Sequence, residues 1–289
     1  MDFFLLLQER RNVVRIEKIC IDLDNTFCCG QTFRWKRQED GSWLGNVDGR
    51  AVRVMHEGDD LCLYGAREED EGFWRNYFDA DSDYEALLGA VMDEHLRAAM
   101  DACPGIRVLD QPFYETLCSF IISANNNIPR ITSIVERFCA IAPQDENGLH
   151  AFPTPQMVLD AGEEWVKSIG SGYRAKYLWE AAQRMADGFD AQALRSMSYP
   201  EACECIRQFK GVGEKVADCV LLFSCGHRAA FPVDTWSEKM LMQWYGMTGK
   251  RPQLKTQAMQ HFGAHGGIAQ QYLFYHAMQS KLKKENNEK

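Results

Sequence analysis

The hydrophobic pattern of this 289-residue chain changes period after about residue 105, and this change constrains the fold more than any other feature. Before it, short apolar runs are separated by Asp-Gly and Glu-Gly pairs, which favour hairpin turns. These runs predict strands at 43–47, 50–55 and 60–65. After it, apolar residues recur at helical spacing almost to the end. The sequence therefore predicts an α+β fold, with an antiparallel sheet domain at 1–105 and a helical domain at 106–289.

The helical spacing begins before this change and divides into several segments. Apolar residues from Tyr84 to Leu96 already recur at helical spacing, with Asp81 or Ser82 as the expected N-cap. Further helices are expected at 113–123, 128–140, 165–169, 177–186, 199–208, 216–223, 235–245 and 268–282. We find no internal repeat and no low-complexity linker, and only the last few residues have the composition of a disordered tail.

The composition, 46% hydrophobic and 25% charged, is that of an ordinary globular protein. No apolar run is long enough to cross a bilayer, and Asp2 stands where a signal peptide needs basic residues. The eleven cysteines are scattered and odd in number, and the pairs Cys28-Cys29 and Cys203-x-Cys205 lack a matching second pair. We therefore expect reduced thiols, a cytoplasmic location, and neither zinc nor an iron–sulfur cluster.

The densest chemical signal is the run FKGVGEKVADCV, from Phe209 to Val220. One helix ends near Gln208, Gly211 and Gly213 form a tight turn, and a new helix begins. The glycines allow a phosphate to approach closely, and the amides at the new N-terminus carry partial positive charge. Such a helix-hairpin-helix element holds the DNA backbone without reading sequence. Taken alone, a turn of this kind more often merely connects two helices.

Lys215 lies in the first turn of the new helix, where the positive end of the dipole disfavours an ammonium group. A solvated lysine is the simpler interpretation unless a carboxylate lies nearby. Asp234, in the run FPVDTW, is the expected N-cap of the helix at 235–245. Backbone amides keep such a carboxylate ionised and fixed in position. If the two helices pack side by side, Lys215 and Asp234 face one cleft.

The hairpin GVGEKVADC followed by PVD resembles the signature of the helix-hairpin-helix DNA glycosylases. Four further motifs extend the resemblance over both halves of the chain, to the 8-oxoguanine DNA glycosylases with AP lyase activity. They are CGQTFRW at 29–35, SANNNIPRIT at 123–132, SGYRAKY at 171–177 and AQQYLF at 269–274. The resemblance implies a base-excision repair enzyme without a cofactor. It is expected to act as a monomer on double-stranded DNA containing an oxidised purine, at the bacterial nucleoid or in a eukaryotic nucleus.

The resemblance also implies roles for single residues. Lys215 attacks C1′ of the flipped nucleotide and forms a Schiff base, while Asp234 stabilises the charge that develops on the sugar. The carbonyl of Gly30 accepts from the hydrogen on N7 of 8-oxoguanine and repels the N7 lone pair of guanine. Four residues enclose the base: Cys219 and Phe274 on its two faces, Gln270 at its Watson–Crick edge, and Pro232. Without the resemblance, Gly30 would be a turn residue and Phe274 a core residue.

The implied DNA contacts follow from the same motifs. Asn125 fills the gap left by the flipped base, Tyr173 is a wedge at the opposite strand, and Arg130 and Arg174 donate to the orphaned cytosine. The other implied contacts are Asn127, Gly211, Gly213, Val216 and Trp236. Trp236 is a departure, because eukaryotic members have a histidine there. Tryptophan cannot titrate, which removes any histidine-linked pH dependence and points to a bacterial branch.

Other interpretations remain open at this stage. The net charge of −9 argues against a nucleic-acid partner, although stretches near Arg130, at 174–176 and at 281–284 are locally basic. An alkylpurine glycosylase of the same superfamily generally uses the aspartate without a lysine, so Lys215 argues against it. An iron–sulfur relative is disfavoured because no cysteine follows Cys225. A non-catalytic DNA-binding module would tolerate Lys215→Gln.

Overall fold

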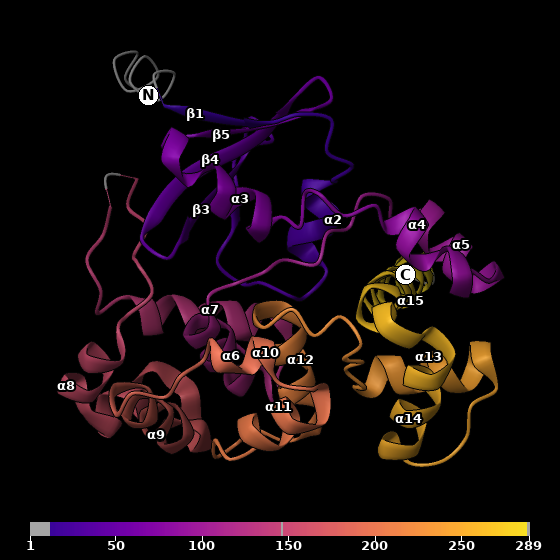
Figure 1. The fold of residues 1–289 in the computed structure, drawn as a ribbon. Helices are drawn as coiled ribbons and strands as arrows, with labels where there is room; N and C mark the ends of the chain where they lie inside the picture. Colours follow the sequence, from indigo (N-terminus) through magenta and orange to yellow (C-terminus); the bar gives the residue numbers. More distant parts are fainter. Residues whose placement is uncertain (1–11, 146, 288–289) are drawn as a thin grey trace.

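The computed structural model describes residues 12–145 and 147–287, and its architecture is α+β, as predicted (Figure 1). A five-stranded antiparallel sheet in the order β1-β5-β4-β3-β2 comes first in the chain. Its strands are β1 (Val13–Ile16), β2 (Lys36–Arg37), β3 (Trp43–Val47), β4 (Arg50–Glu57) and β5 (Asp60–Tyr64). The expectation about a signal peptide concerns residues 1–11, which lie outside the described part. The side chains of the basic stretch at 281–284 lie outside it too.

The three predicted strands are confirmed, and the turn residues explain the hairpin between the first two. Asp48 and Gly49 connect β3 to β4 with φ values of 53° and 76°. Positive φ at both central positions is the geometry of a type I′ turn, whose twist matches that of the strands. The strand register accordingly pairs Val47 with Arg50. β1 and β2 were not predicted, because four and two residues are too few to show a period of two.

The other regular elements of the described chain are helices. Two belong to the sheet domain, α2 (Leu23–Cys28) and α3 (Glu71–Tyr77). The others are α4 (Tyr84–Leu88), α5 (Glu94–Ala102), α6 (Phe113–Ser123), α7 (Ile128–Cys139), α8 (Pro155–Val166), α9 (Ala175–Ala186), α10 (Ala193–Ser196), α11 (Tyr199–Ile206), α12 (Glu214–Ser224), α13 (Thr235–Tyr245), α14 (Arg251–Phe262) and α15 (Gly266–Asn287). The predicted bounds of α6 and α13 agree with the structure to the residue.

One helix prediction is wrong and another is incomplete. The segment at 84–96 is not one helix, because Asp83 caps α4 and Asp93 caps a separate α5. Asp81 and Ser82 are therefore not caps. The helix predicted at 165–169 is confirmed but too short, because it covers only the end of α8 and part of the π-helix that follows at Lys167–Ser171, and α14 was not predicted. In α8, Gly162 with a φ of 80° interrupts the helical spacing, and the polar surface of α14 hides its period.

The sheet and the helices have separate cores. Aromatic side chains of the sheet domain form the smaller core, in which Phe27 stacks on Trp35 with ring centroids 4.3 Å apart. The larger core belongs to the helices and includes Leu88 and Leu96. α5 packs against α15 from the far end of the chain, as Figure 1 shows at the C-terminus. The division of the chain after residue 105 stays a prediction.

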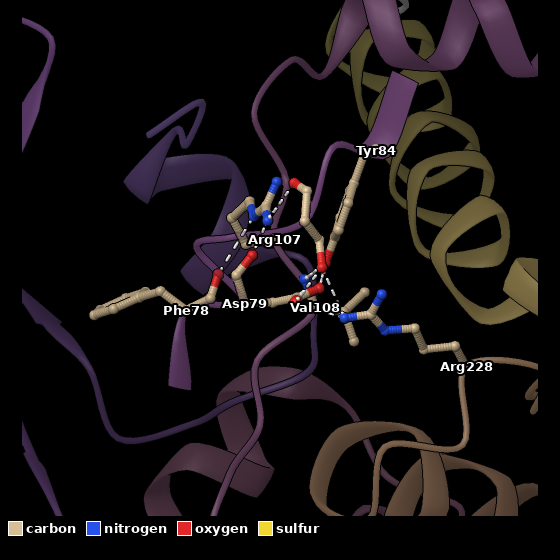
Figure 2. A network of polar contacts seen from close by, with 7 residues as sticks. Phe78, Asp79, Tyr84, Arg107, Val108 and Arg228 are labelled. Carbon is tan, nitrogen blue, oxygen red and sulfur yellow. Dashed lines mark hydrogen bonds and ion pairs between the residues drawn. The ribbon is translucent and has the colours of Figure 1, made fainter. Parts of the chain in front are cut away.

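Arg107 anchors the segment that connects the two cores (Figure 2). Its side chain is buried, and its guanidinium lies 3.9 Å from the ring centroid of Tyr84. It donates to three backbone carbonyls, those of Phe78, Asp79 and Ser82. Asp79 also accepts from the hydroxyl of Tyr84 at 2.8 Å and from Arg228 at 2.6 Å. Because Arg228 lies between α12 and α13, this network fastens the connecting segment to the helices.

Gln31 fastens the loop after α2 to the same segment. Its side-chain amide donates to the carbonyl of Arg107 at 2.7 Å, and its Oε1 accepts from the Leu109 amide at 2.9 Å. Gln111 donates to the carbonyl of Gln31 at 2.8 Å. All these groups are buried, where each hydrogen bond is costly to leave unmade. The loop that carries Gly30 is therefore held against the start of the helical part.

Gly105 is required where the connecting segment passes α2, which yields a stability prediction. Its φ is +69°, and a Cβ would lie 2.8 Å from the carbonyl carbon of Ile21, a backbone atom. Gly105→Ala should lower the free energy of unfolding by about 3 kcal/mol, since left-handed strain and steric overlap add. In Gly41→Ala, where φ is +83° and no atom lies within 4 Å, only the strain of about 1–2 kcal/mol should remain. Urea denaturation measures both, and equal losses would contradict the prediction.

Candidate active site

The hairpin between α11 and α12 has the shape that its glycines predict. Gly211 has a φ of +81°, and a Cβ there would overlap the ring of Tyr177, only 2.8 Å from its Cγ. The hairpin therefore packs directly on α9 and needs glycine at this position. Gly213 is the N-cap of α12, and no atom lies within 4 Å of the place its Cβ would take. The first amides of α12 are thus accessible to a phosphate.

Lys215 and Asp234 line the same cavity, of about 930 Å³, as their positions on two helix starts predict. The Nζ of Lys215 lies 3.5 Å from the hydroxyl of Ser123 and 5.0 Å from the ring centroid of Phe120. Asp234 caps α13, and its Oδ1 accepts from the amides of Trp236 and Ser237, both at 2.9 Å. Among the described residues, Lys215 and Asp234 form no ion pair with each other. The amine and the Oδ2 of Asp234 are both available to a ligand.

A small pocket of about 40 Å³ continues from this cavity into the protein. Its lining includes all the residues predicted to bind the base, namely Gly30, Cys219, Pro232, Gln270 and Phe274. Lys215 and Asp234 line it too. A space of this size holds a few water molecules and no purine. A Cβ on Gly30 would lie 3.7 Å from the Phe274 ring, so that ring stands close to Gly30.

Gln270 carries an unpaired acceptor in this pocket. Its Nε2 donates to the hydroxyl of Ser237 at 3.2 Å, whereas its Oε1 is buried and has no hydrogen-bond partner in the described residues. A buried acceptor without a partner costs about 1–3 kcal/mol. A ligand that presents an N–H group to Gln270 would recover this energy. The edge of a purine that carries N1–H and an amino group meets that requirement.

Cys219 lies at the same pocket as a neutral thiol. Burial raises the pKa of the Cys219 thiol to about 11, and the nearby Lys215 offsets this only in part. A thiol with such a pKa is almost entirely protonated at neutral pH, and the thiolate is the nucleophilic form. Cys219 therefore acts as a small apolar surface. Lys215 and Cys219 both line this pocket, and the high pKa of the thiol leaves Lys215 as the better candidate nucleophile.

The loop that leads into α7 borders the large cavity. Asn125 is exposed with a φ of 52°, a left-handed conformation that asparagine tolerates. Asn127 is the N-cap of α7 and accepts from the Arg130 amide at 3.1 Å. Asn125 and Asn127 line the cavity, whereas the exposed Arg130 does not. This loop thus presents polar groups and the exposed guanidinium of Arg130 to the outside.

Arg174 binds the backbone of this loop from a buried position. It is 5% exposed and donates from Nε to the carbonyl of Ala124 at 3.0 Å and from Nη2 to that of Asn125 at 3.2 Å. Its Nη1 donates to the carbonyl of Ser171 at 3.3 Å. Its charge therefore does not make the stretch at 174–176 a basic surface. Tyr173 is 60% exposed, with its ring against the Arg174 guanidinium, and stands beside the same loop.

The remaining predicted contacts lie around the cavity entrance. Val216 is buried and, like Trp236, lines the large cavity. Several other lining residues were not predicted, among them Ser123 and Arg251. Ser123 ends α6 and begins the motif at 123–132, but no pattern indicates that its own side chain reaches the cavity. Arg251 begins α14, the helix that the sequence did not reveal. In both cases only tertiary packing brings the side chain to the cavity.

Other kinds of site find no support in the part of the chain that the structure describes. No group of three or more His, Cys, Asp or Glu side chains there could hold a metal ion. None of the helices at residues 12–145 and 147–287 combines the length and apolarity of a membrane span.

Comparison with known proteins agrees with this geometry. Residues 13–117 match the family "8-oxoguanine DNA glycosylase, N-terminal domain", and residues 118–263 match "HhH-GPD superfamily base excision DNA repair protein". The chain is 30% identical over 230 residues to a probable N-glycosylase/DNA lyase of Methanothermobacter thermautotrophicus, covering 71% of this chain and 74% of that protein. It is 29% identical over 272 residues to the N-glycosylase/DNA lyase of Saccharomyces cerevisiae, covering 83% and 72%.

A solved structure is similar over nearly the whole chain. It is the Clostridium acetobutylicum 8-oxoguanine glycosylase/lyase in complex with double-stranded DNA containing cytosine opposite 8-oxoguanine. The TM-score is 0.89 at 35% sequence identity, over 94% of this chain and 97% of that one. The fold and the cavity therefore place the protein in the class of helix-hairpin-helix DNA glycosylases.

The chain belongs to the 8-oxoguanine DNA glycosylases of the HhH-GPD superfamily, and it is a bifunctional N-glycosylase/DNA lyase of base excision repair. The alternatives of an alkylpurine glycosylase and of a non-catalytic DNA-binding module are therefore set aside.

Proposed function

We propose that Lys215 is the nucleophile that removes 8-oxoguanine from double-stranded DNA and that Asp234 stabilises the transition state. The observation that supports this most is the shared cavity, in which the amine and the carboxylate stand beside the predicted base pocket. The lone pair of the neutral amine forms a bond to C1′ as the bond to the base breaks. The base leaves with the bonding electron pair and takes up a proton.

The second half of the reaction follows from the covalent adduct. Opening of the sugar ring gives a Schiff base between Lys215 and C1′, which acidifies the hydrogens on C2′. Loss of a C2′ proton then expels the 3′ phosphate and nicks the strand. Asp234 faces the positive charge that develops on the sugar, and its two amide bonds fix it before the substrate arrives. A preorganised charge of this kind costs no reorganisation during the reaction.

Recognition of the lesion is assigned to the pocket residues. The carbonyl of Gly30 would accept from N7–H of 8-oxoguanine, and Oε1 of Gln270 from the Watson–Crick edge. Phe274 and Cys219 would cover the two faces of the base, with Pro232 beside them. The unpaired Oε1 of Gln270 supports this assignment. Phe274 lines this pocket together with Gly30, Cys219, Pro232 and Gln270, which supports a shared role in holding the base.

Contacts to the duplex are assigned to the exposed loops. Asn125 would fill the gap left by the base, Tyr173 would wedge the opposite strand, and Arg130 would donate to the orphaned cytosine. Arg174 can add at most one donor, because four of its five N–H groups already bind backbone carbonyls. The other contacts would come from Asn127, Val216, Trp236 and the hairpin glycines, Gly211 and Gly213. The enzyme would act as a monomer on chromosomal DNA, in the bacterial cytoplasm or in a eukaryotic nucleus.

Borohydride trapping tests the nucleophile. The wild-type protein should form a covalent product with a duplex that contains 8-oxoguanine, and Lys215→Gln should form none, because only an amine gives a reducible Schiff base. Lys210→Gln is the matched control, since Lys210 lies in the same hairpin and is 64% exposed, paired with Glu180. It should trap as the wild type does. Trapping of Lys215→Gln at the wild-type level would show that another amine reacts.

Gly30→Ala tests the readout of the lesion. A Cβ would meet only ordinary contacts at 3.7 Å in the pocket, but the φ of +82° and the approach of the base both favour glycine. The rate of 8-oxoguanine excision should fall by about 10-fold or more, which corresponds to roughly 1.4 kcal/mol of lost stabilisation. Binding to a duplex with an abasic analogue should change by less than about 3-fold. Equal losses in both assays would remove the readout role.

Cleavage of 8-oxoguanine opposite each of the four bases tests the role of Arg130. Cytosine should be preferred by about 10- to 100-fold, the usual value of a good arginine–base contact. Arg130→Gln should flatten this preference while preserving Schiff-base trapping. The matched control is Arg184→Gln, which removes an arginine on α9 that donates to Gln208. A wild-type enzyme that cleaves equally opposite all four bases would contradict the proposal.

A further inference from the structure

Arg251 lies at the large cavity, and the proposed reaction assigns it no role. It lines the large cavity together with Lys215 and Asp234. These three are the charged side chains among the lining residues, two cationic and one anionic. If Lys215 reacts as a neutral amine, Arg251 is the cation that remains in this lining. A cavity that receives a phosphodiester chain needs such a charge, especially in a protein with a net charge of −9.

The guanidinium of Arg251 is fixed beside the catalytic carboxylate. Its Nη2 donates to the hydroxyl of Thr235 at 3.0 Å, and Thr235 directly follows Asp234. Its Nε donates to Oε2 of Glu238 at 2.8 Å. The side chain is nevertheless half exposed, and two of its five N–H groups are used by described residues. The other three are available to an anion in the cavity.

The position of Arg251 is set by a buried ion pair one turn further along α14. Lys255 lies four residues after Arg251, and its Nζ is 2.8 Å from Oδ2 of Asp218 in α12. The Asp218 side chain is 1% exposed and that of Lys255 15%. Breaking such a pair would leave a buried charge without a partner, so α14 is firmly docked on the helix that carries Lys215. Arg251 and Lys215 therefore keep a fixed relative position.

We propose that Arg251 binds a phosphate next to the extruded nucleotide and so aligns C1′ with Lys215. The proposal rests on the proposed entry of that nucleotide into this cavity. Arginine can hold two phosphate oxygens at once, and this fixes orientation as well as position. Thr235 and Glu238 hold the guanidinium at the cavity with two of its N–H groups and leave the other three for the phosphate. Arg251 is thus a DNA-binding residue that the reaction depends on through alignment.

The salt dependence of DNA binding tests this proposal. The probe is a duplex with a tetrahydrofuran abasic analogue opposite cytosine, which the enzyme cannot cleave. In Arg251→Gln the slope of log K against log salt concentration should become shallower by about 0.9, the loss of one phosphate contact. Affinity at moderate salt should fall by about 10-fold. Arg251→Lys should keep the wild-type slope.

Arg97→Gln is the matched control for the loss of a surface arginine. Arg97 is 45% exposed and pairs with Glu85 at 2.8 Å, close to the values of Arg251 and Glu238, but it lies on α5 and away from the cavity. Its slope should equal that of the wild type. If Arg251→Gln also keeps the wild-type slope, the proposal is wrong. If the wild-type protein fails to trap with borohydride, the proposed reaction is wrong instead, so the two failures are distinguishable.

Neutral methylphosphonate linkages locate the contact. One linkage is placed on either side of the abasic analogue, and binding of the wild type and of Arg251→Gln is compared. At one of the two positions the linkage should weaken the wild type by about 10-fold and leave Arg251→Gln nearly unchanged, because the contact is already lost. Additive losses at both positions would show that Arg251 touches neither phosphate. A purely structural role of Arg251 would also give additive losses.

Discussion

The hydrogen bond from the side chain of Gln271 to the carbonyl of Cys29 joins the two parts of the chain at the active cavity. It is 2.8 Å long and buried. Gly30 follows Cys29 directly, so this bond places Gly30 against α15 and beside Phe274. The hydrogen bonds of Gln31 and Arg107 hold the other side of the same loop. Without these contacts the base pocket would lose the wall that comes from the sheet domain.

Lys215 and Asp234, the two groups that we propose take part in the reaction, both lie at the starts of helices. Asp234 is fixed by amides that the start of α13 would otherwise leave unpaired, so capping and chemistry use the same geometry. Lys215 stands at the start of α12, beside the Phe120 ring and with no carboxylate paired to it in the described residues. The fold thus prepares both groups before DNA binds.

Local features of the sequence determined much of this outcome. The change of period predicted the α+β architecture, and the glycine hairpin and the capping Asp234 predicted which residues meet. Sequence reasoning failed where the local signal was weak, as in the two-residue β2 and the polar α14. It also misjudged Arg174, expected among the basic surface stretches, because burial beneath the Asn125 loop cannot be read from sequence.

What the sequence by itself determined was the set of short-range rules: turns that need positive φ, helices that need caps, and motifs with fixed spacing. These rules act between residues a few positions apart, so they can be recognised in the sequence. The tertiary structure alone decided which further side chains share the cavity, such as Ser123 and Arg251. This sharing depends on packing between elements far apart in the chain, and no local pattern encodes that packing.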